Sequence, residues 1–337
     1  MSRAPERADR VERGAVSAFL AVDSGGSGVR VAVGVPGTDR TAEASTREPV
    51  RTSERGIDPA HLMTQVAPLA RTLATEVGAD RISWAVVGAA GFASLGDALR
   101  AELPGALARE LGVGTVALAA DAVTAYVGAL GPRPGAVLAA GTGLIAVGTD
   151  LTDWRRADGW GHLLGDCGGG AWIGRAGLDA ALRAYDGRDG GSAALLECAT
   201  ERFGAMAELP ARIYPRSDRA AVLASFAPAV GECAAHDPIA AGILRTAARH
   251  LAESAAAVCP AEGEPEVALT GGLFRLGAPL LAPLREELAK RLPHATSVPA
   301  EGDPLRGAVR LAADLAAGRR DVPIAPTMLH VVTISTD

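Results

Sequence analysis

The sequence predicts an α/β protein with a mixed sheet and about two domains. Its 337 residues are enough for two domains of roughly 150 residues each. Apolar strands alternate with segments of helical spacing, which is typical of an α/β sheet and not of a sandwich or a helical bundle. A Gly-hydroxyl-Gly turn between two apolar strands also occurs twice, at 18–35 and 135–150. This repetition indicates a weak internal duplication.

The first part of the chain predicts a hairpin followed by alternating helices and strands. Residues 1–16 read as a disordered tail, and the ordered fold begins with two strands around the turn DSGGSG. Helices are expected over 61–77, 94–112 and 121–130, and strands over 81–91 and 116–120. Pro104 falls inside the second of these helices, where we expect a break.

After the second hairpin, the chain beyond residue 170 reads as largely helical. It returns to strand at 266–270, to helix at 273–292, to strand at 295–300 and to helix at 304–318. The apolar segment 319–337 has no clear pattern and is expected to be a C-terminal tail.

Composition excludes several classes of protein. A net charge of −6 and 4% aromatic residues argue against a nucleic-acid partner. Lys290 is the only lysine and lies in an amphipathic helical pattern, which argues against a Walker A loop, a protein-kinase fold and a pyridoxal Schiff base. The sequence has no apolar run long enough for a membrane span. The four scattered cysteines favour free thiols and a cytoplasmic location.

The turn DSGGSG is the first candidate for phosphate binding. Asp23 ends a buried strand, and its carboxylate could orient a hydrated Mg²⁺. The residues after it free backbone amides and add hydroxyls, so that they could wrap phosphate oxygens: Ser24, Gly25, Gly26, Ser27 and Gly28. An ordinary tight hairpin is the alternative.

Gly141, Thr142 and Gly143 form the second such turn. Two similar turns, one from each half of a chain without a catalytic lysine, suit a phosphate chain held between two domains, because such a chain needs donors from both sides. The pair therefore favours phosphate binding.

Three further positions could carry chemistry. Asp121 follows an apolar strand and opens a helix, so it is either a helix N-cap or a general base facing a cleft. Asp166 lies in a glycine-rich loop containing two tryptophans and is either a turn residue before a helix or part of a loop shaped to bring its backbone against another group. Gly271 and Gly272 end a strand and form either a helix-entry turn or a flat surface for a nucleotide base.

These motifs together resemble the N-acetylglucosamine kinase branch of the superfamily that contains acetate and sugar kinases, heat-shock cognate proteins and actin. The activator ATPases of 2-hydroxyacyl-CoA dehydratases belong to the same branch. The resemblance covers roughly residues 18–318. It rests on AVDSGGSGVR, the ADA at 120–122, AAGTG, GWGHLLGDCGGGAWIGR, LTGGLF and GDPLRGA, in this order.

The resemblance implies two ribonuclease-H-like, actin-like ATPase domains with an interdomain cleft for MgATP and a sugar. The first would span 17–128 and be completed by a helix at about 304–318, and the second would span 129–303. The implied site roles are Asp23 for the metal, the two turns for phosphates, Asp121 as catalytic base, and Gly271 with Gly272 for adenosine. Asp121, Gly143, Asp166 and Cys167 would contact the sugar. A homodimer is also implied.

The resemblance therefore implies an ATP-dependent sugar kinase. It would transfer phosphate to a hydroxyl group, expected to be the 6-hydroxyl, of N-acetylglucosamine, glucosamine or a related hexose. Cys167 and Gly169 stand where the family usually has glutamate and serine, which predicts an altered sugar preference. Two alternatives stay open: an activator-type ATPase that drives a partner protein, and a sugar or nucleotide sensor without turnover.

Overall fold

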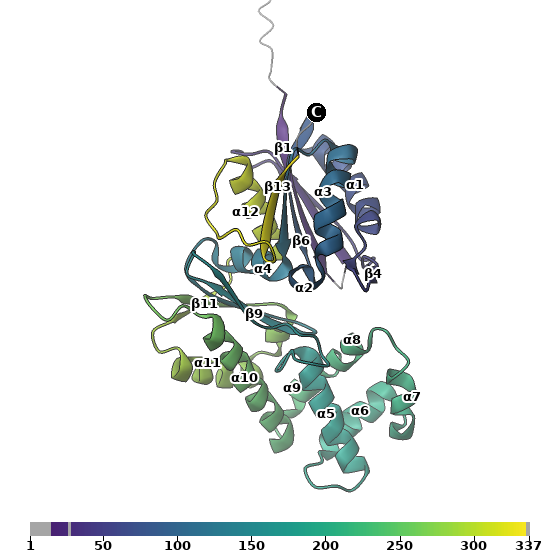
Figure 1. Cartoon of the computed structure of the whole chain (residues 1–337). Coiled ribbons are helices and arrows are strands. Elements are labelled where there is room, and N and C mark those ends of the chain that lie inside the picture. The colour runs from purple at the N-terminus through teal and green to yellow at the C-terminus, as the bar shows by residue number, and fades with distance from the viewer. Residues whose placement is uncertain (1–14, 26–27, 335–337) are drawn as a thin grey trace, which may run out of the picture.

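The structure is a computed structural model that describes residues 15–25 and 28–334. It has two lobes, each with its own sheet, one above the other in Figure 1. The first lobe holds a six-stranded sheet together with the helices packed on it, and the second holds a five-stranded sheet with its helices. Most of the predicted tail over residues 1–16, and Gly26 and Ser27 of the first turn, lie outside the described residues.

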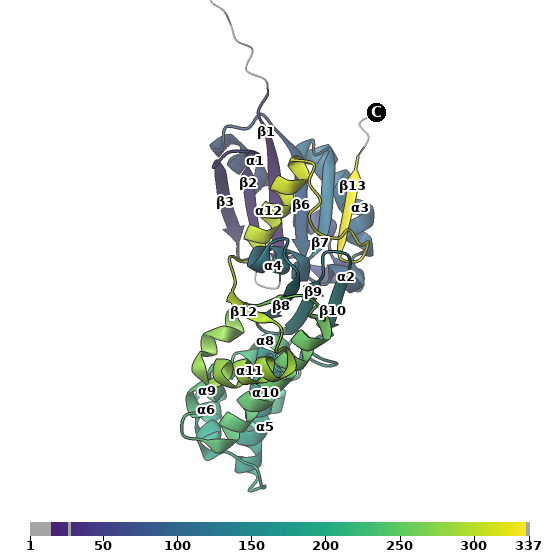
Figure 2. The same cartoon turned by 90° about the vertical axis from the view of Figure 1, so that its left-hand side faces the viewer.

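The sheet of the first lobe has the strand order β13-β7-β6-β1-β2-β3. Its strands are β1 (Ser17–Gly25), β2 (Gly28–Gly34), β3 (Thr41–Thr46), β6 (Arg81–Ala89), β7 (Thr115–Ala120) and β13 (Leu329–Thr333). Helices α1 (Pro59–Glu76) and α3 (Asp97–Leu111) cover one face, and α4 (Asp121–Leu130) and α12 (Pro304–Ala316) cover the other (Figures 1 and 2). A short ribbon, β4 (Thr52–Ser53) with β5 (Gly56–Ile57), and helix α2 (Phe92–Leu95) complete this lobe.

The sheet of the second lobe has the order β10-β9-β8-β11-β12. Its strands are β8 (Gly135–Ala140), β9 (Leu144–Thr149), β10 (Trp154–Asp158), β11 (Glu266–Thr270) and β12 (Thr296–Pro299). Helix α4 of the first lobe packs on one face of this sheet, and α10 (Pro238–Val258) packs on the other. The remaining elements are α5 (Gly170–Tyr185), α6 (Ala193–Phe203), η1 (Met206–Glu208), α7 (Leu209–Ile213), α8 (Arg219–Ala224), α9 (Ala227–Cys233), η2 (Gly272–Leu276) and α11 (Ala278–Arg291).

Both sheets are connected in the same way. In each, three consecutive strands form an antiparallel meander. A later strand pairs in parallel with the first strand of the meander, and a further strand pairs in parallel with that later strand. The tight turns of the leading hairpins, β1–β2 and β8–β9, are the two glycine-hydroxyl turns of the sequence. This common topology agrees with the internal duplication inferred from the repeated pattern.

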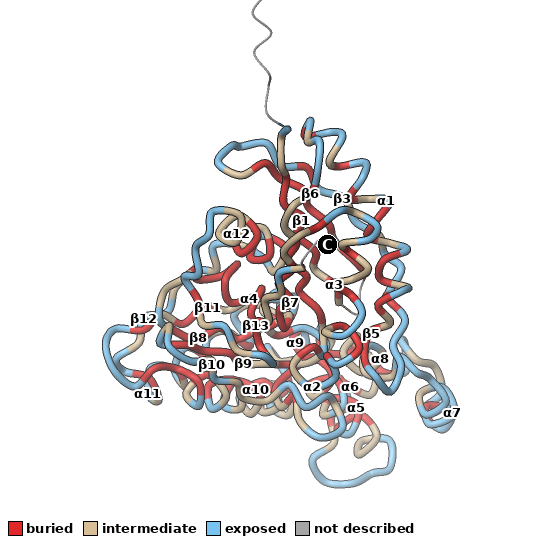
Figure 3. Tube along the Cα trace, turned by 45° about the horizontal axis from the view of Figure 1, so that its top comes forward, coloured by how far each residue is buried: buried red, intermediate tan, exposed pale blue. Residues whose placement is uncertain are grey.

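Local sequence signals explain where several helices begin. An Asp-Pro pair opens α1, α10 and α12: the aspartate side chain accepts backbone N–H groups, and proline occupies the first helical position. Each lobe then buries its own apolar core, seen as the red stretches of the trace in Figure 3. Tyr126 of α4 is fully buried in the first core, and Phe226 in the second.

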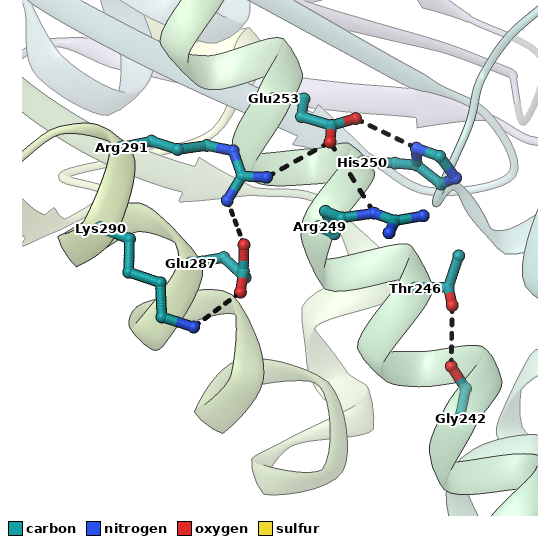
Figure 4. A network of polar contacts seen from close by, with 8 residues as sticks. All are labelled: Gly242, Thr246, Arg249, His250, Glu253, Glu287, Lys290 and Arg291. Atoms are coloured by element: carbon teal, nitrogen blue, oxygen red, sulfur yellow. Dashed lines mark hydrogen bonds and ion pairs between the residues drawn. The ribbon is translucent and has the colours of Figure 1, made fainter.

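Helices α10 and α11 are joined on their outer side by a network of charges (Figure 4). Glu253 of α10 accepts from Arg291 of α11 at 3.3 Å, and Glu287 of α11 pairs with both Arg291 and Lys290. Lys290, whose side chain is 64% exposed, therefore lies on the surface of α11, as its sequence context predicted.

Three sequence expectations are wrong. The break expected at Pro104 does not occur, because helix α3 continues through it. Pro104 is buried against the core, and this packing outweighs the one backbone hydrogen bond that proline cannot make. The helix expected from residue 273 starts only at Ala278, because Gly277 has a φ of +68° and separates η2 from α11. The segment 319–337 is not simply a tail, since it contributes β13 to the first sheet. The predicted domain boundaries, near residues 128 and 303, stay predictions.

Candidate active site

A cleft of about 580 Å³ lies where the two lobes meet. The first lobe contributes Gly25 at the end of β1 and the start of α4, and the second contributes the β8–β9 turn and the loop after β10. The lining residues with a bearing on chemistry are Gly25, Ser94, Asp121, Gly141, Thr142, Gly143, Arg156, Asp166 and Gly271. Seven of the twelve described positions singled out as site residues therefore line one space, whereas Asp23 is not among its lining residues.

Asp121 is the first residue of α4, and Ala120 occupies the N-cap position. Oδ1 of Asp121 accepts the N–H of Ala122 at 2.9 Å. The Asp121 side chain makes no capping hydrogen bond to the N–H groups of the next turn. The N-cap interpretation is therefore wrong. Burial raises the pKa of the Asp121 carboxyl to about 6, an effect that the nearby Asp23 adds to and that Arg156 opposes.

The β8–β9 turn keeps its amides toward the cleft. Gly141 closes the turn by donating its N–H to the carbonyl of Gly143 at 2.9 Å. The carbonyls of Gly141 and Thr142 accept the N–H groups of Gly170 and Ala171 at the start of α5, at 2.9 and 2.8 Å. These bonds turn the carbonyl side of the loop toward α5, so the amides of Thr142 and Gly143 are left for a bound anion.

Asp166 is buried beside this turn. A Cβ on Gly143 would lie 2.2 Å from Oδ2 of Asp166, so only glycine allows the carboxylate to come this close. Oδ1 of Asp166 accepts the N–H of Gly161 at 3.0 Å, and burial raises the pKa of the Asp166 carboxyl. Asp166 thus holds the glycine-rich loop in shape as well as facing the cleft.

Asp158, at the end of β10, supports the same loop. Its two carboxylate oxygens accept the N–H groups of Asp166 and Cys167. Both aspartates have left-handed backbone, with φ of +60° for Asp158 and +55° for Asp166. Such strained positions need support from their surroundings, which these hydrogen bonds supply.

Asp23 can take part in holding a metal ion. Oδ2 of Asp23 accepts from Nε and Nη2 of Arg30, at 3.0 and 2.7 Å, and Nη1 of Arg30 pairs with Asp303. Oδ1 has no hydrogen bond to another described residue. Within the described residues no group of three or more carboxylate, imidazole or thiol side chains forms a metal site. One free carboxylate oxygen suits Mg²⁺, which keeps most of its ligands as water and phosphate.

A second cavity of about 550 Å³ continues from the same turn, because Gly141 and Thr142 line both spaces. Gly272, Leu273 and Arg275 form one wall, and α8 and α9 form another. Gly271 has a φ of +106° and passes so close to β8 that a Cβ would lie 2.2 Å from the carbonyl of Ala140. Gly271 lines the first cleft and Gly272 lines this second cavity, so the two glycines lie where both spaces approach the β8–β9 turn.

Some predicted residues lie apart from the cleft. Ser24, in β1, is 1% exposed. Gly28 is buried, and a Cβ at this position would lie 2.1 Å from the carbonyl of Thr46. Cys167 is not among the cleft-lining residues, although its neighbour Asp166 is. A Cβ on Gly169 would lie 2.8 Å from Gly143, so this loop has no room for a serine there. Gly26 and Ser27 lie outside the described residues.

Sequence reasoning missed Arg30, Arg156 and Asp158. Arg30 is the cross-strand partner of Asp23 in the β1–β2 hairpin, a pairing that could have been found by counting residues back from the turn. Arg156 carries a weaker signal, as a charged residue in a strand just before the glycine-rich loop. Nothing in the sequence marks Asp158 as the acceptor for the backbone of that loop.

The fold and the cleft together define a class: an α/β protein of two actin-like ATPase lobes with a cleft between them. Residues 20–312 match the BadF/BadG/BcrA/BcrD ATPase family, and the chain belongs to this family. This family and the N-acetylglucosamine kinase homologues below confirm the resemblance drawn from the motifs.

Solved structures confirm the predicted fold. A protein from Chromobacterium violaceum provisionally named N-acetylglucosamine kinase is 26% identical, with a TM-score of 0.69 over 88% of this chain and 99% of that chain. A ROK family glucokinase from Streptomyces griseus, in complex with glucose and AMPPNP, is 20% identical with a TM-score of 0.51, over 89% of this chain and 99% of that one.

A curated relative, the N-acetylmuramic acid/N-acetylglucosamine kinase of Clostridium acetobutylicum, is 38% identical over 82 residues. That match spans 24% of this chain and 27% of the relative. No helix among the described residues is long and apolar enough to cross a membrane.

Proposed function

We propose that this protein is an ATP-dependent kinase that transfers the γ-phosphate of ATP to the 6-hydroxyl of an amino sugar or related hexose. N-acetylglucosamine and glucosamine are the first candidate acceptors. The observation that carries the proposal is the meeting of Asp121, a carboxylate with a pKa of about 6, and the Thr142–Gly143 amides in one cleft between the lobes. The similarity to N-acetylglucosamine kinases along nearly the whole chain supports it.

In this mechanism Asp121 accepts the proton of the attacking hydroxyl. A general base works best when its pKa lies near the working pH, and a carboxyl with a pKa of about 6 is mostly ionised at pH 7. The amides of Thr142 and Gly143 stabilise charge on the group being transferred. Asp166 binds the sugar, and Gly271 with Gly272 borders the adenosine.

In this proposal Asp23 would hold a hydrated Mg²⁺ through Oδ1, which has no hydrogen bond to another described residue, and Arg30 fixes the orientation of the carboxylate. When bound, the ion neutralises phosphate charge and aligns the nucleotide. The proposal also includes the homodimeric state and the cytoplasmic location expected from the sequence. The curated relative adds N-acetylmuramic acid, which is N-acetylglucosamine bearing a lactic acid ether, to the acceptors worth testing.

A sugar panel with MgATP tests the function. ADP release and sugar phosphate are measured together for N-acetylglucosamine, glucosamine, glucose and N-acetylmuramic acid, with Asp121→Asn as the inactive control. We expect equal amounts of ADP and sugar phosphate for at least one acceptor. ADP release that no sugar stimulates would contradict the kinase and favour the activator-type ATPase.

A further inference from the structure

Arg156 is a cationic side chain that the mechanism above does not use. It lies on β10, the edge strand of the second sheet, and is partly exposed to the cleft. Among the described residues that line the cleft, it is the one arginine, and no lysine lines the space. Any anionic group that enters the cleft beyond reach of the backbone amides therefore meets this guanidinium.

The guanidinium is held by an aromatic ring and not by a carboxylate. It lies over the ring of Trp160, with 4.4 Å between Cζ and the ring centroid, and Trp160 is itself 62% exposed. Within the part of the chain that the structure describes, Arg156 makes no ion pair and no side-chain hydrogen bond. By contrast, Arg30 beside the same cleft pairs with two aspartates. Stacking fixes the plane of the Arg156 guanidinium while its N–H donors stay available.

Strand register places Arg156 away from the β8–β9 turn. Its partner on β9 is Val147, four residues beyond Gly143, which puts its backbone about 13 Å along the strand from the phosphate turn. Its charge acts on Asp121, where it favours the ionised carboxylate. In the proposed mechanism the reacting hydroxyl of the sugar touches Asp121, and the phosphate chain lies at the β8–β9 turn. Since Arg156 acts on Asp121 and its backbone lies away from that turn, an anionic group bound by Arg156 is expected to belong to the sugar and not to the phosphate chain.

We propose that Arg156 binds a carboxylate carried by the acceptor, so that the preferred substrates of this kinase are acidic amino sugars. This inference rests on the proposed function and specifies its substrate class. A guanidinium binds a carboxylate through two parallel hydrogen bonds, and such a bond is strong when the site is partly desolvated. A neutral sugar leaves the guanidinium without its anion, and sites built for a polar group discriminate strongly against ligands that lack it.

The test compares N-acetylmuramic acid with its methyl ester, which has nearly the same shape but no charge. For the wild type we expect kcat/KM for the acid to exceed that for the ester by about 10- to 100-fold, as charged hydrogen bonds typically give. At pH 8, where Asp121 stays ionised, Arg156→Gln should remove this preference by slowing the acid reaction alone, and Arg156→Lys should keep part of it. The matched control is Arg155→Gln, because Arg155 is the exposed neighbour on the opposite face of β10.

Two results would overturn the inference. One is a wild type that handles acid and ester equally. The other is an equal loss for every sugar in Arg156→Gln, which would assign the guanidinium to the phosphate chain. Calorimetric binding of acid and ester without nucleotide gives a second readout that does not depend on turnover. A wild type that binds the acid selectively through Arg156 but phosphorylates no sugar would contradict the kinase function and leave this inference supported.

Discussion

At the scale of single residues, Asp121 combines two features that a base in a cleft needs. Its position at the start of α4 fixes the backbone, and the one bond from Ala122 leaves carboxylate lone pairs for a substrate. Burial makes the carboxylate more basic than an exposed one. Both features follow from the abrupt change from strand β7 to helix α4 at the edge of the cleft.

Replacement of Asp121 by asparagine should separate catalysis from folding. Asp121→Asn should turn over its sugar at least about a hundredfold more slowly, because the amide cannot take the proton. Burial of the Asp121 carboxylate, whose pKa rises from 3.8 to about 6, lowers the free energy of unfolding by at most about 3 kcal/mol at pH 8. Asparagine is uncharged and avoids this loss. The variant should therefore melt at or above the wild-type temperature at pH 8, and this advantage should shrink below pH 6.

The control is Asp97→Asn, at the exposed first turn of α3, which should leave turnover unchanged. Steady-state kinetics and thermal melts at pH 5 and pH 8 measure both effects. A folded Asp121→Asn protein that keeps most of its turnover would remove Asp121 from the catalytic role.

The same carboxyl predicts the acid limb of the pH profile. A base must be ionised to act, so kcat/KM should fall tenfold per pH unit below a midpoint near 6. Arg156→Gln should move this midpoint upward, because the positive charge favours the ionised form of Asp121. Initial rates between pH 4.5 and 8 measure the midpoint, and a limb near pH 4 in the wild type would contradict the assignment.

The sequence predicted the site residues that stand at turns and strand ends, because glycine spacing and helix starts are local signals. It did not reveal Arg30, whose role depends on pairing across the hairpin and on Asp303 far along the chain. The loop that holds Asp166 was recognised as unusual from its glycines. The cross-loop support from Asp158 depends on backbone angles that no local pattern shows.

At the scale of elements, β13 is the clearest difference between sequence and structure. Prolines and mixed polarity in 319–337 hide a five-residue strand that pairs antiparallel with β7. The N–H of Ala120 donates to the carbonyl of Met328 at 2.8 Å, so the segment before β13 also supports the residue that precedes Asp121. Strands and helices with clear periodicity could be predicted from the sequence. The edge strand β13 could not, because it forms by pairing with β7, which lies far from it in the sequence.

Leu329 tests the contribution of β13. It is 4% exposed in the first core, so Leu329→Ala should lower the free energy of unfolding by about 2–4 kcal/mol through lost burial and a cavity. Thr333→Ala, at the exposed end of the same strand, is the control. Chemical denaturation compares the two variants, and equal stability would mean that β13 contributes little to the first sheet.

At the scale of the whole molecule, two crossings of the chain join the lobes, between α4 and β8 and between β12 and α12. Arg133 of the first crossing pairs with Glu301 of the second and with Glu266 of β11, each at 2.7 Å. The N–H of Glu301 also donates to the carbonyl of Ala129. Both crossings are therefore held together at one side of the cleft, which suits rotation of one lobe against the other.

Nucleotide binding between the lobes should stabilise the whole molecule. MgATP at a hundred times its dissociation constant should add about 2.7 kcal/mol by mass action, which would appear as a higher melting temperature. Thr142→Pro, which removes one amide of the proposed phosphate-binding turn, should reduce this shift in melting temperature. Unchanged melting with both MgATP and MgADP would contradict nucleotide binding at these turns.

The return of the last forty residues to the first lobe has a consequence for how the protein is made. Residues 135–299 are contiguous, so the second sheet has all of its strands once they have left the ribosome. The first sheet must wait for α12 to cover β1 and for β13 to pair with β7, at sequence separations of more than 200 residues. During synthesis the first lobe therefore keeps an apolar face and a sheet edge uncovered until α12 and β13 have left the ribosome, and a chaperone would have most to bind in that interval.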